Sequence, residues 1–269
     1  MAAVRKKNHV INWIHDLPVG WLIVVVFAGM SVITAAVYGG VMALAAGPRG
    51  PKLQISPGML PPMALVFGLL VGFLVAQLWG NASSARTAVN QEASSLRTVV
   101  LLADAFPGKP EAGIDAFVRQ HIETAVSKEW PAMARQNETL TEVPRALAGA
   151  LQATIALKPR TIGQQVAQRE IVTALESALD ARRQRIILSQ STVNWVKWTA
   201  VIALSILTMI GIALVHSDNR RNAKLAMSIF AAATAVTIVV IASEDRPFSG
   251  PFRVSPAALL QVLPPKAPV

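Results

Sequence analysis

Four long apolar stretches constrain the fold of this chain more than any other feature. The first, Val19 to Gly47, contains no charged residue over 29 residues. At about 1.5 Å per residue, a helix of this length exceeds the roughly 30 Å hydrocarbon core of a bilayer. Three further apolar stretches cover residues 59–80, 196–215 and 225–243. Only 15% of the chain is charged, against about 25% in a soluble domain. The sequence therefore predicts a membrane protein with four transmembrane helices.

The first stretch has one competing interpretation, a secretory signal peptide. Arg5, Lys6 and Lys7 precede it, and Ala43-Leu44-Ala45 resembles a cleavage site. The apolar region of a signal peptide spans only about 7 to 15 residues. Because the stretch is much longer than that, we expect an uncleaved transmembrane helix.

The spacing of the four spans predicts two hairpins separated by a polar insert. Twenty of the 25 Lys and Arg residues fall on the side that holds the termini and the insert. Cytoplasmic segments collect Lys and Arg, so we expect both termini in the cytoplasm. The predicted segments are a cytoplasmic N-terminus at 1–18, a first hairpin at 19–80, a helical cytoplasmic insert at 81–195, a second hairpin at 196–243 and a cytoplasmic tail at 244–269.

The insert shows helical periodicity throughout, so the predicted fold class is all-α. Small and apolar residues recur every three or four positions from Ala82 to Ala103, which predicts that the second span continues as one helix of about 45 residues. A second helix is expected from about Gly113 to Pro131. Thr139 and Glu142 form a potential capping box before a third helix, which should stop near Lys158-Pro159. A fourth helix is expected from about Gly163 into the third span.

The sequence offers little for enzymatic chemistry. It has no cysteine, and its four histidines are scattered along the chain. It contains no glycine-rich phosphate loop, no G-x-S-x-G motif and no H-E-x-x-H motif. We therefore expect no enzyme activity, no metal and no cofactor. The net charge of +10 suits an anionic membrane surface, and without basic runs interleaved with aromatic residues we expect no nucleic-acid partner.

The second span carries two distinct faces. Gly68, Gly72 and Ala76 lie four residues apart, a small-residue stripe that favours close helix packing. The opposite face becomes polar toward the insert and would suit a hydrophobic pore neck. Simple lipid contact is the alternative interpretation of this face. Its predicted pore-lining residues are Val66, Leu70, Phe73, Gln77 and Asn81.

The fourth span ends in the cluster "SEDRPFSGPFRVSP" at 243–256. Pro247 should end the helix, because proline has no amide proton and disfavours helical geometry at the preceding residue. We expect Glu244, Asp245 and Arg246 to pair locally or with the "RRQR" helix at 182–185, and Phe248 to anchor the chain. The alternative is a direct role at the inner entrance of an ion pathway.

Several of these segments resemble one family. "GLLVGFLVAQLW" at 68–79, "EASSLR" at 92–97, "EWP" at 129–131 and above all "DRPFSG" at 245–250 are similar to the bestrophin-like membrane proteins, a mostly bacterial family distantly related to bestrophin channels. The resemblance implies four spans, both ends inside, a neck made by the second span, and a bacterial inner-membrane location. It also implies assembly as a homo-oligomer, a pentamer by analogy with bestrophins, that passes small ions.

The sequence thus supports two main hypotheses and a weaker one. The first is an oligomeric ion channel whose neck is formed by the second span, with Glu92 as a charged ring in the cytoplasmic vestibule. The second is a non-conducting scaffold or signalling protein that acts through its cytoplasmic helices. The weaker one is a transporter of small solutes, which typically needs an ionisable residue within the spans.

Overall fold

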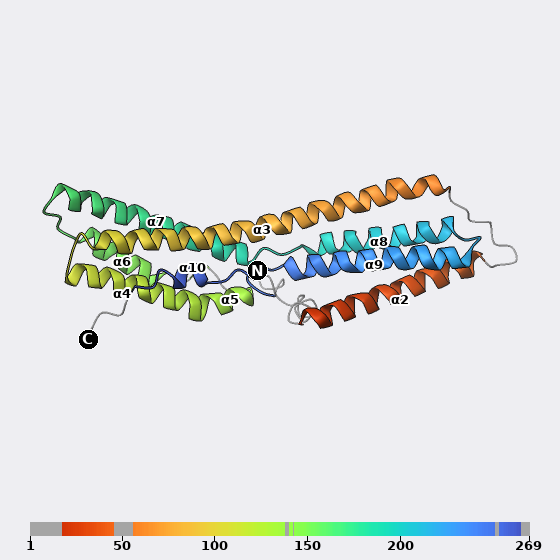
Figure 1. The fold of residues 1–269 in the computed structure, drawn as a ribbon, viewed down its shortest axis with the longest axis horizontal. Coiled ribbons are helices and arrows are strands. Elements are labelled where there is room, and N and C mark those ends of the chain that lie inside the picture. Colours follow the sequence, from red (N-terminus) through yellow and green to blue (C-terminus); the bar gives the residue numbers. More distant parts are fainter. Residues whose placement is uncertain (1–17, 46–55, 138–139, 142, 251–252, 265–269) are drawn as a thin grey trace. The chain divides into compact units, whose positions relative to one another are not determined.

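The chain folds into helices, as predicted (Figure 1). The structure is a computed structural model, and it describes residues 18–45, 56–137, 140–141, 143–250 and 253–264. No strand occurs in these ranges. The helices are α2 (Val19–Ala45), α3 (Leu60–Ala103), α4 (Lys109–Thr124), α5 (Trp130–Ala134), α6 (Arg145–Ile155), α7 (Ile162–Ser189), α8 (Trp195–Val215), α9 (Arg220–Glu244) and α10 (Ala257–Leu260). A 3₁₀ turn (Pro57–Met59) precedes α3, and a π-helical turn (Ala125–Glu129) joins α4 to α5.

The helices form two compact units. The first comprises the described residues within 1–79 and 192–245, and the second comprises those within 80–191 and 246–269. Helix α3 contributes to both, because its first twenty residues belong to the first unit and the rest to the second. The C-terminal tail folds with the insert.

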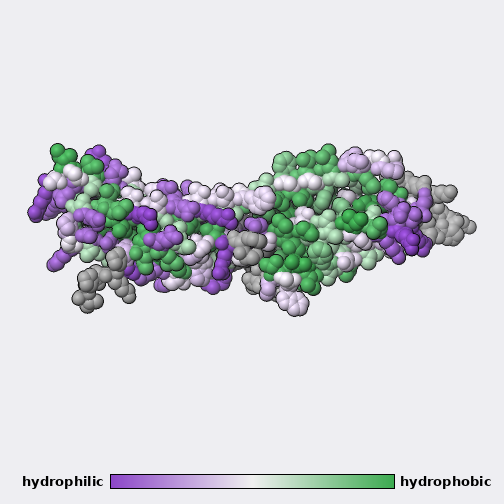
Figure 2. Space-filling model, viewed as in Figure 1, coloured by the Kyte–Doolittle hydropathy of each residue, from purple (hydrophilic) through white to green (hydrophobic). Residues whose placement is uncertain are grey.

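The first unit contains the membrane spans. Among the described residues, four helices are long and apolar enough to cross a bilayer: α2, α3, α8 and α9. Helices α2, α8 and α9 pack around buried Met209, Met227 and Ala235. Helix α3 joins them through Leu74 and Leu78, which pack with Val201 of α8 and Ile241 of α9. Hydrophobic residues dominate the face of this unit that Figure 2 shows, as expected of helices that face lipid.

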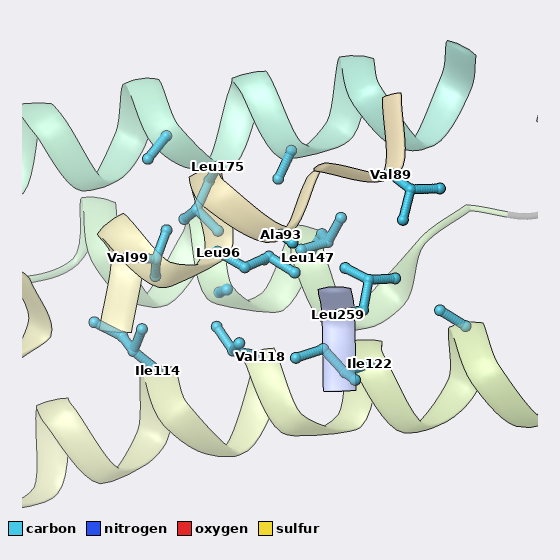
Figure 3. Close-up of a cluster of buried hydrophobic side chains, with 14 of the residues drawn as sticks. Val89, Ala93, Leu96, Val99, Ile114, Val118, Ile122, Leu147, Leu175 and Leu259 are labelled. Carbon is cyan, nitrogen blue, oxygen red and sulfur yellow. The ribbon is translucent and has the colours of Figure 1, made fainter. Parts of the chain in front are cut away.

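The second unit has an ordinary hydrophobic core (Figure 3). Leu96 and Val99 of α3 pack against Ile114, Val118 and Ile122 of α4, and Leu147, Leu175 and Leu259 complete the cluster from α6, α7 and α10. The periodic apolar faces predicted for α3 and α4 are the faces that are buried here. Ordinary burial of amphipathic helices therefore holds this unit together.

Most helix boundaries agree with the sequence pattern, including the uninterrupted α3. One prediction is wrong: α7 does not run into the third span but ends at Ser189, and α8 begins at Trp195. The break has two causes, one local and one distant in sequence. The Asn194 side chain accepts a hydrogen bond from the Val196 amide and so caps α8. The Val193 amide donates a hydrogen bond to the Asp245 carboxylate at 2.6 Å.

The helix expected to stop at Pro131 does not end abruptly there. The π-helical turn precedes it, and the chain then continues as α5 to Ala134. Pro131 is tolerated because it lies in the first turn of α5, where no intrahelical amide bond is needed. The predicted capping box at Thr139 and Glu142 lies outside the described residues, and α6 begins at Arg145 directly after Pro144.

Close packing of α6 on α4 generates a first prediction. A Cβ atom added at Gly149 of α6 would lie 2.6 Å from the Phe117 ring of α4, whereas one added at Gly113 of α4 would meet nothing within 4 Å. We expect Gly149→Ala to lower the free energy of unfolding by about 1–3 kcal/mol through overpacking. Gly113→Ala should be neutral or stabilise by about 0.5–1 kcal/mol. Melting temperatures of the purified variants test this, and equal values for both variants would contradict it.

Candidate functional site

The predicted neck residues of the first unit lie mostly on an open face of α3. Val66 and Phe73 are 53% and 73% exposed in the single chain, and Gln77 is also exposed. Leu70 is half-buried because it packs against the cluster around Leu74 and Leu78. The structure therefore leaves the side chains of Val66, Phe73 and Gln77 exposed and draws Leu70 partly into the helix packing.

The polar end of the predicted neck has a defined partner. The Lys197 ammonium of α8 donates a hydrogen bond to Gln77 Oε1 at 2.5 Å. A cation is therefore held beside the amide at the end of the apolar stretch. Asn81, which belongs to the second unit, is half-buried.

Within the part of the chain that the structure describes, the small-residue stripe is not used for close helix packing. Gly68, Gly72 and Ala76 are exposed, and a Cβ atom at either glycine would meet nothing within 4 Å. Close approach in this unit occurs instead at Gly211 of α8, where an added Cβ atom would lie 3.2 Å from Met63 Sδ of α3. The stripe leaves α3 open to a neighbour that is not part of this chain.

Glu92 lies inside the second unit, unlike the vestibule position expected from the sequence. Its side chain is fully buried, on the same side of α3 as buried Val89 and Leu96. The Arg185 guanidinium of α7 donates to both of its oxygens, from Nε to Oε2 at 2.7 Å and from Nη2 to Oε1 at 3.0 Å. His121 Nε2 of α4 lies 2.8 Å from Oε1. A carboxylate enclosed in this way does not present its charge to a water-filled vestibule.

The same guanidinium joins a second carboxylate. Arg185 Nη2 donates to Glu129 Oε2 at 2.8 Å, and Arg182 Nε donates to Glu129 Oε1 at 2.8 Å. The Trp130 ring lies 4.7 Å from the Arg185 carbon that joins its nitrogens, a cation–π arrangement. We call Glu92, His121, Glu129, Arg182 and Arg185 the buried ion network.

The charges of this network balance. Two guanidinium groups face two carboxylates, so the set is neutral when the imidazole is neutral. Burial by itself would raise the pKa of Glu129, but Arg185 and Arg182 outweigh that effect and hold its pKa below the ordinary value. Burial likewise disfavours the charged form of Arg185, yet the two carboxylates raise its pKa further. Glu129 and Arg185 are therefore ionised at neutral pH, and the network holds α3, α4, the π-helical turn and α7 together.

The DRPFSG segment lies partly against this network. The Phe248 ring packs edge-on against Trp130, with ring centres 5.7 Å apart. Trp130 Nε1 donates to the Val254 carbonyl at 3.1 Å, and the Val254 amide donates to the Pro247 carbonyl at 2.8 Å. Gly250 has a φ of +80°, a left-handed conformation that suits glycine. The tail is thus folded back onto the tryptophan that covers Arg185.

The acidic end of α9 has a separate partner. Glu244 is the last residue of α9, and Asp245 follows as its C-cap. Asp245 is buried and accepts the Val193 amide proton, so it joins the end of α9 to the start of the third span. The arginines Arg182 and Arg185 of the "RRQR" helix are instead paired with Glu129 and Glu92.

Comparison with known proteins decides the family. The Bestrophin-like domain model matches residues 25–259, which is most of the chain. The chain belongs to the bestrophin-like family. The match spans both units, including the buried ion network and the DRPFSG segment.

Solved structures support the same fold. A single-residue variant of a bacterial bestrophin homologue from Klebsiella pneumoniae superposes with a TM-score of 0.67 at 12% identity, covering 90% of this chain and 97% of that chain. Another structure of a bestrophin homologue from this organism gives a TM-score of 0.63 at 13% identity, covering 90% and 94%. At such identities the likeness establishes the fold alone. Among curated proteins, no sequence matches significantly.

Sequence reasoning missed the buried ion network of this bestrophin-like chain. The signal was present, because each ionic residue adjoins the apolar face of its helix. Glu92 lies at helical spacing between Val89 and Leu96. His121 lies in the same way between Val118 and Ala125. Ionisable residues at core positions are buried only when they are paired. The partners could not be chosen from sequence, since they are 29 and 93 residues away from Glu92.

The central arginine gives a second prediction. Removing one partner of a buried ion pair typically costs about 3–5 kcal/mol, because the remaining charge is left uncompensated. We expect Arg185→Met to destabilise the protein on this scale. Arg183→Met is the matched control, since Arg183 is exposed on the same helix. Melting temperatures in detergent test this, and a loss of the same size for both variants would show that the network is unimportant.

The lowered pKa of Glu129 gives a third prediction. A depressed carboxyl pKa adds stability above the unfolded value, 4.5, and this stability is lost as pH falls through the lower folded value. Glu129→Gln should therefore be less stable than wild type at pH 7, and the difference should shrink below about pH 4.5. Glu123→Gln, at an exposed pair with Arg119, should match wild type throughout. Melting temperatures across pH measure both differences, and a gap that is independent of pH would contradict the assignment.

Proposed function

We propose that the protein is a homo-oligomeric, pentameric ion channel of the bacterial inner membrane, with α3 forming its neck. The bestrophin-like family and fold favour an ion channel in general. The observation that carries the proposal is the open face of α3, where the side chains of Val66 and Phe73 are largely exposed and Gln77, also exposed, accepts a hydrogen bond from Lys197 of α8. Leu70 and Asn81 border this face.

The three faces of α3 suit a ring of subunits. At about 100° per residue, the neck face lies about 90° around the helix from the buried face of Phe67, Leu74 and Leu78. The small-residue stripe lies about 140° around in the other direction. Each α3 in a ring can thus pack on its own α8 and α9, turn its neck face to the axis, and offer Gly68 and Gly72 to an adjacent subunit.

Exposed apolar side chains in the second unit also favour assembly. Leu101, Val143, Ile155 and Ile162 are 64%, 71%, 63% and 80% exposed, although they lie outside the apolar spans. Interaction surfaces expose large apolar side chains of this kind where these lie together. We assign them to contacts between subunits. The scaffold hypothesis assigns them instead to a different protein partner.

The orientation belongs to the same proposal. Both termini and the second unit would face the cytoplasm, because most Lys and Arg residues lie on that side of the spans. The Lys197 ammonium held by Gln77 would then lie near the inner end of the neck. A fixed cation there would influence which ions enter.

Conduction provides the fourth prediction. Purified protein in liposomes should pass monovalent ions, and Phe73→Ala should increase the flux by widening a neck that is closed by dewetting. We expect an increase on the order of tenfold, which corresponds to a barrier lowered by about 1.4 kcal/mol. Leu65→Ala, at a position 63% exposed but away from the neck face, should leave the flux unchanged.

Mass measurement of the detergent-solubilised assembly accompanies the flux assay. A pentamer that conducts supports the proposal. If neither wild type nor Phe73→Ala passes monovalent ions, the channel is excluded and the scaffold hypothesis takes its place. A conducting monomer would overturn the shared neck.

A further inference from the structure

A groove runs between α2 and α9 in the membrane unit. Its volume is about 370 Å³, within the range of small-molecule sites. From α2 it is lined at helical spacing by Phe27, Met30, Ser31, Thr34, Ala35 and Tyr38. From α9 it is lined by Lys224, Met227, Ser228, Ala231 and Ala232. Both helices are membrane spans, so the groove opens along the hydrocarbon region and not into water.

One end of the groove is cationic. Lys224 lies in the second turn of α9, where the apolar stretch begins, and its ammonium lies 5.4 Å from the centre of the Tyr38 ring. Within the described part of the chain, no carboxylate lies within ion-pair distance of Lys224. Arg220 and Arg221 precede it at the same end of the helix. This end therefore carries positive charge at the depth where lipid headgroups begin.

Apart from the hydroxyls of Ser31, Thr34 and Ser228, the remainder of the groove is apolar. The Ser31 hydroxyl donates to the Phe27 carbonyl at 2.8 Å, and the Thr34 hydroxyl donates to the Met30 carbonyl at 2.7 Å. These hydroxyl protons are thus used within α2 and are not directed at a ligand. Methionine and phenylalanine side chains and two alanines of α9 present hydrocarbon to whatever fills the space.

We propose that this groove binds an anionic phospholipid, with one acyl chain along α2 and α9 and the phosphate beside the Lys224 ammonium. We infer this occupant because the groove is mostly apolar and has a single cationic end at the level of the lipid headgroups. A phosphate accepts hydrogen bonds from an ammonium group, and the bilayer supplies an acyl chain at the same place. The site does not depend on conduction or on the orientation of the chain.

Native mass spectrometry of the full-length protein tests the site. Phosphatidylglycerol and phosphatidylcholine with the same acyl chains are titrated in turn. We expect tighter binding of the first phosphatidylglycerol molecule, and Lys224→Gln should weaken it about fivefold, the factor that corresponds to about 1 kcal/mol per membrane-surface cation. Arg221→Gln is the matched control, because it removes the same charge from the same helix end without lining the groove. Phosphatidylcholine binding should change little in either variant.

A second pair of variants tests the acyl-chain part separately. Ala35 lines the groove and Ala36 does not, although both are exposed on α2. Ala35→Phe should reduce binding of both lipids, whereas Ala36→Phe should bind them as wild type does. Equal effects of Lys224→Gln and Arg221→Gln, or of the two phenylalanine variants, would overturn the proposal. Loss of oligomerisation in Ala35→Phe with lipid binding unchanged would assign the groove to a neighbouring subunit instead and would also overturn it.

Discussion

The second unit depends on one buried cation. Arg185 is fully enclosed, and its charge is tolerated only because Glu92 and Glu129 accept hydrogen bonds from it and Trp130 covers it. These partners come from α3, the π-helical turn and the start of α5. An uncompensated buried charge costs several kcal/mol, whereas hydrophobic contacts alone tolerate sliding between helices. The network therefore fixes the register of helices that the apolar core only brings together.

The tail is joined to the same arrangement through aromatic contacts. Trp130 stacks on Arg185, packs against Phe248 and donates a hydrogen bond to the Val254 carbonyl. The DRPFSG segment thus ends the fourth span and also closes one side of the helical unit. Pro247, Phe248 and Gly250 each serve the turn that brings Val254 back to Trp130.

The membrane unit is built on a different principle. Its exposed surface is apolar. Contact with lipid chains is as favourable for such a surface as contact with another helix, so burial alone does not decide which helix faces pack together. Helix α3 shows the consequence. One face packs through Leu74 and Leu78, while the glycine stripe and the face of Phe73 remain open. Such open faces are what an assembly of several copies would need.

The sequence by itself determined the four spans, the all-α class, the long α3 and the buried faces of α3 and α4, because these follow from hydrophobicity and helical period along the chain. The family resemblance also lay in contiguous motifs. Tertiary structure alone decided that Glu92 is buried, that α7 stops before α8, and that Gly211 makes the close approach expected of Gly68 and Gly72. Each of these depends on a partner distant in sequence, such as Arg185 for Glu92 or Asp245 for Val193. Local periodicity shows which side of a helix is polar, but only the packed fold shows which charge will meet it.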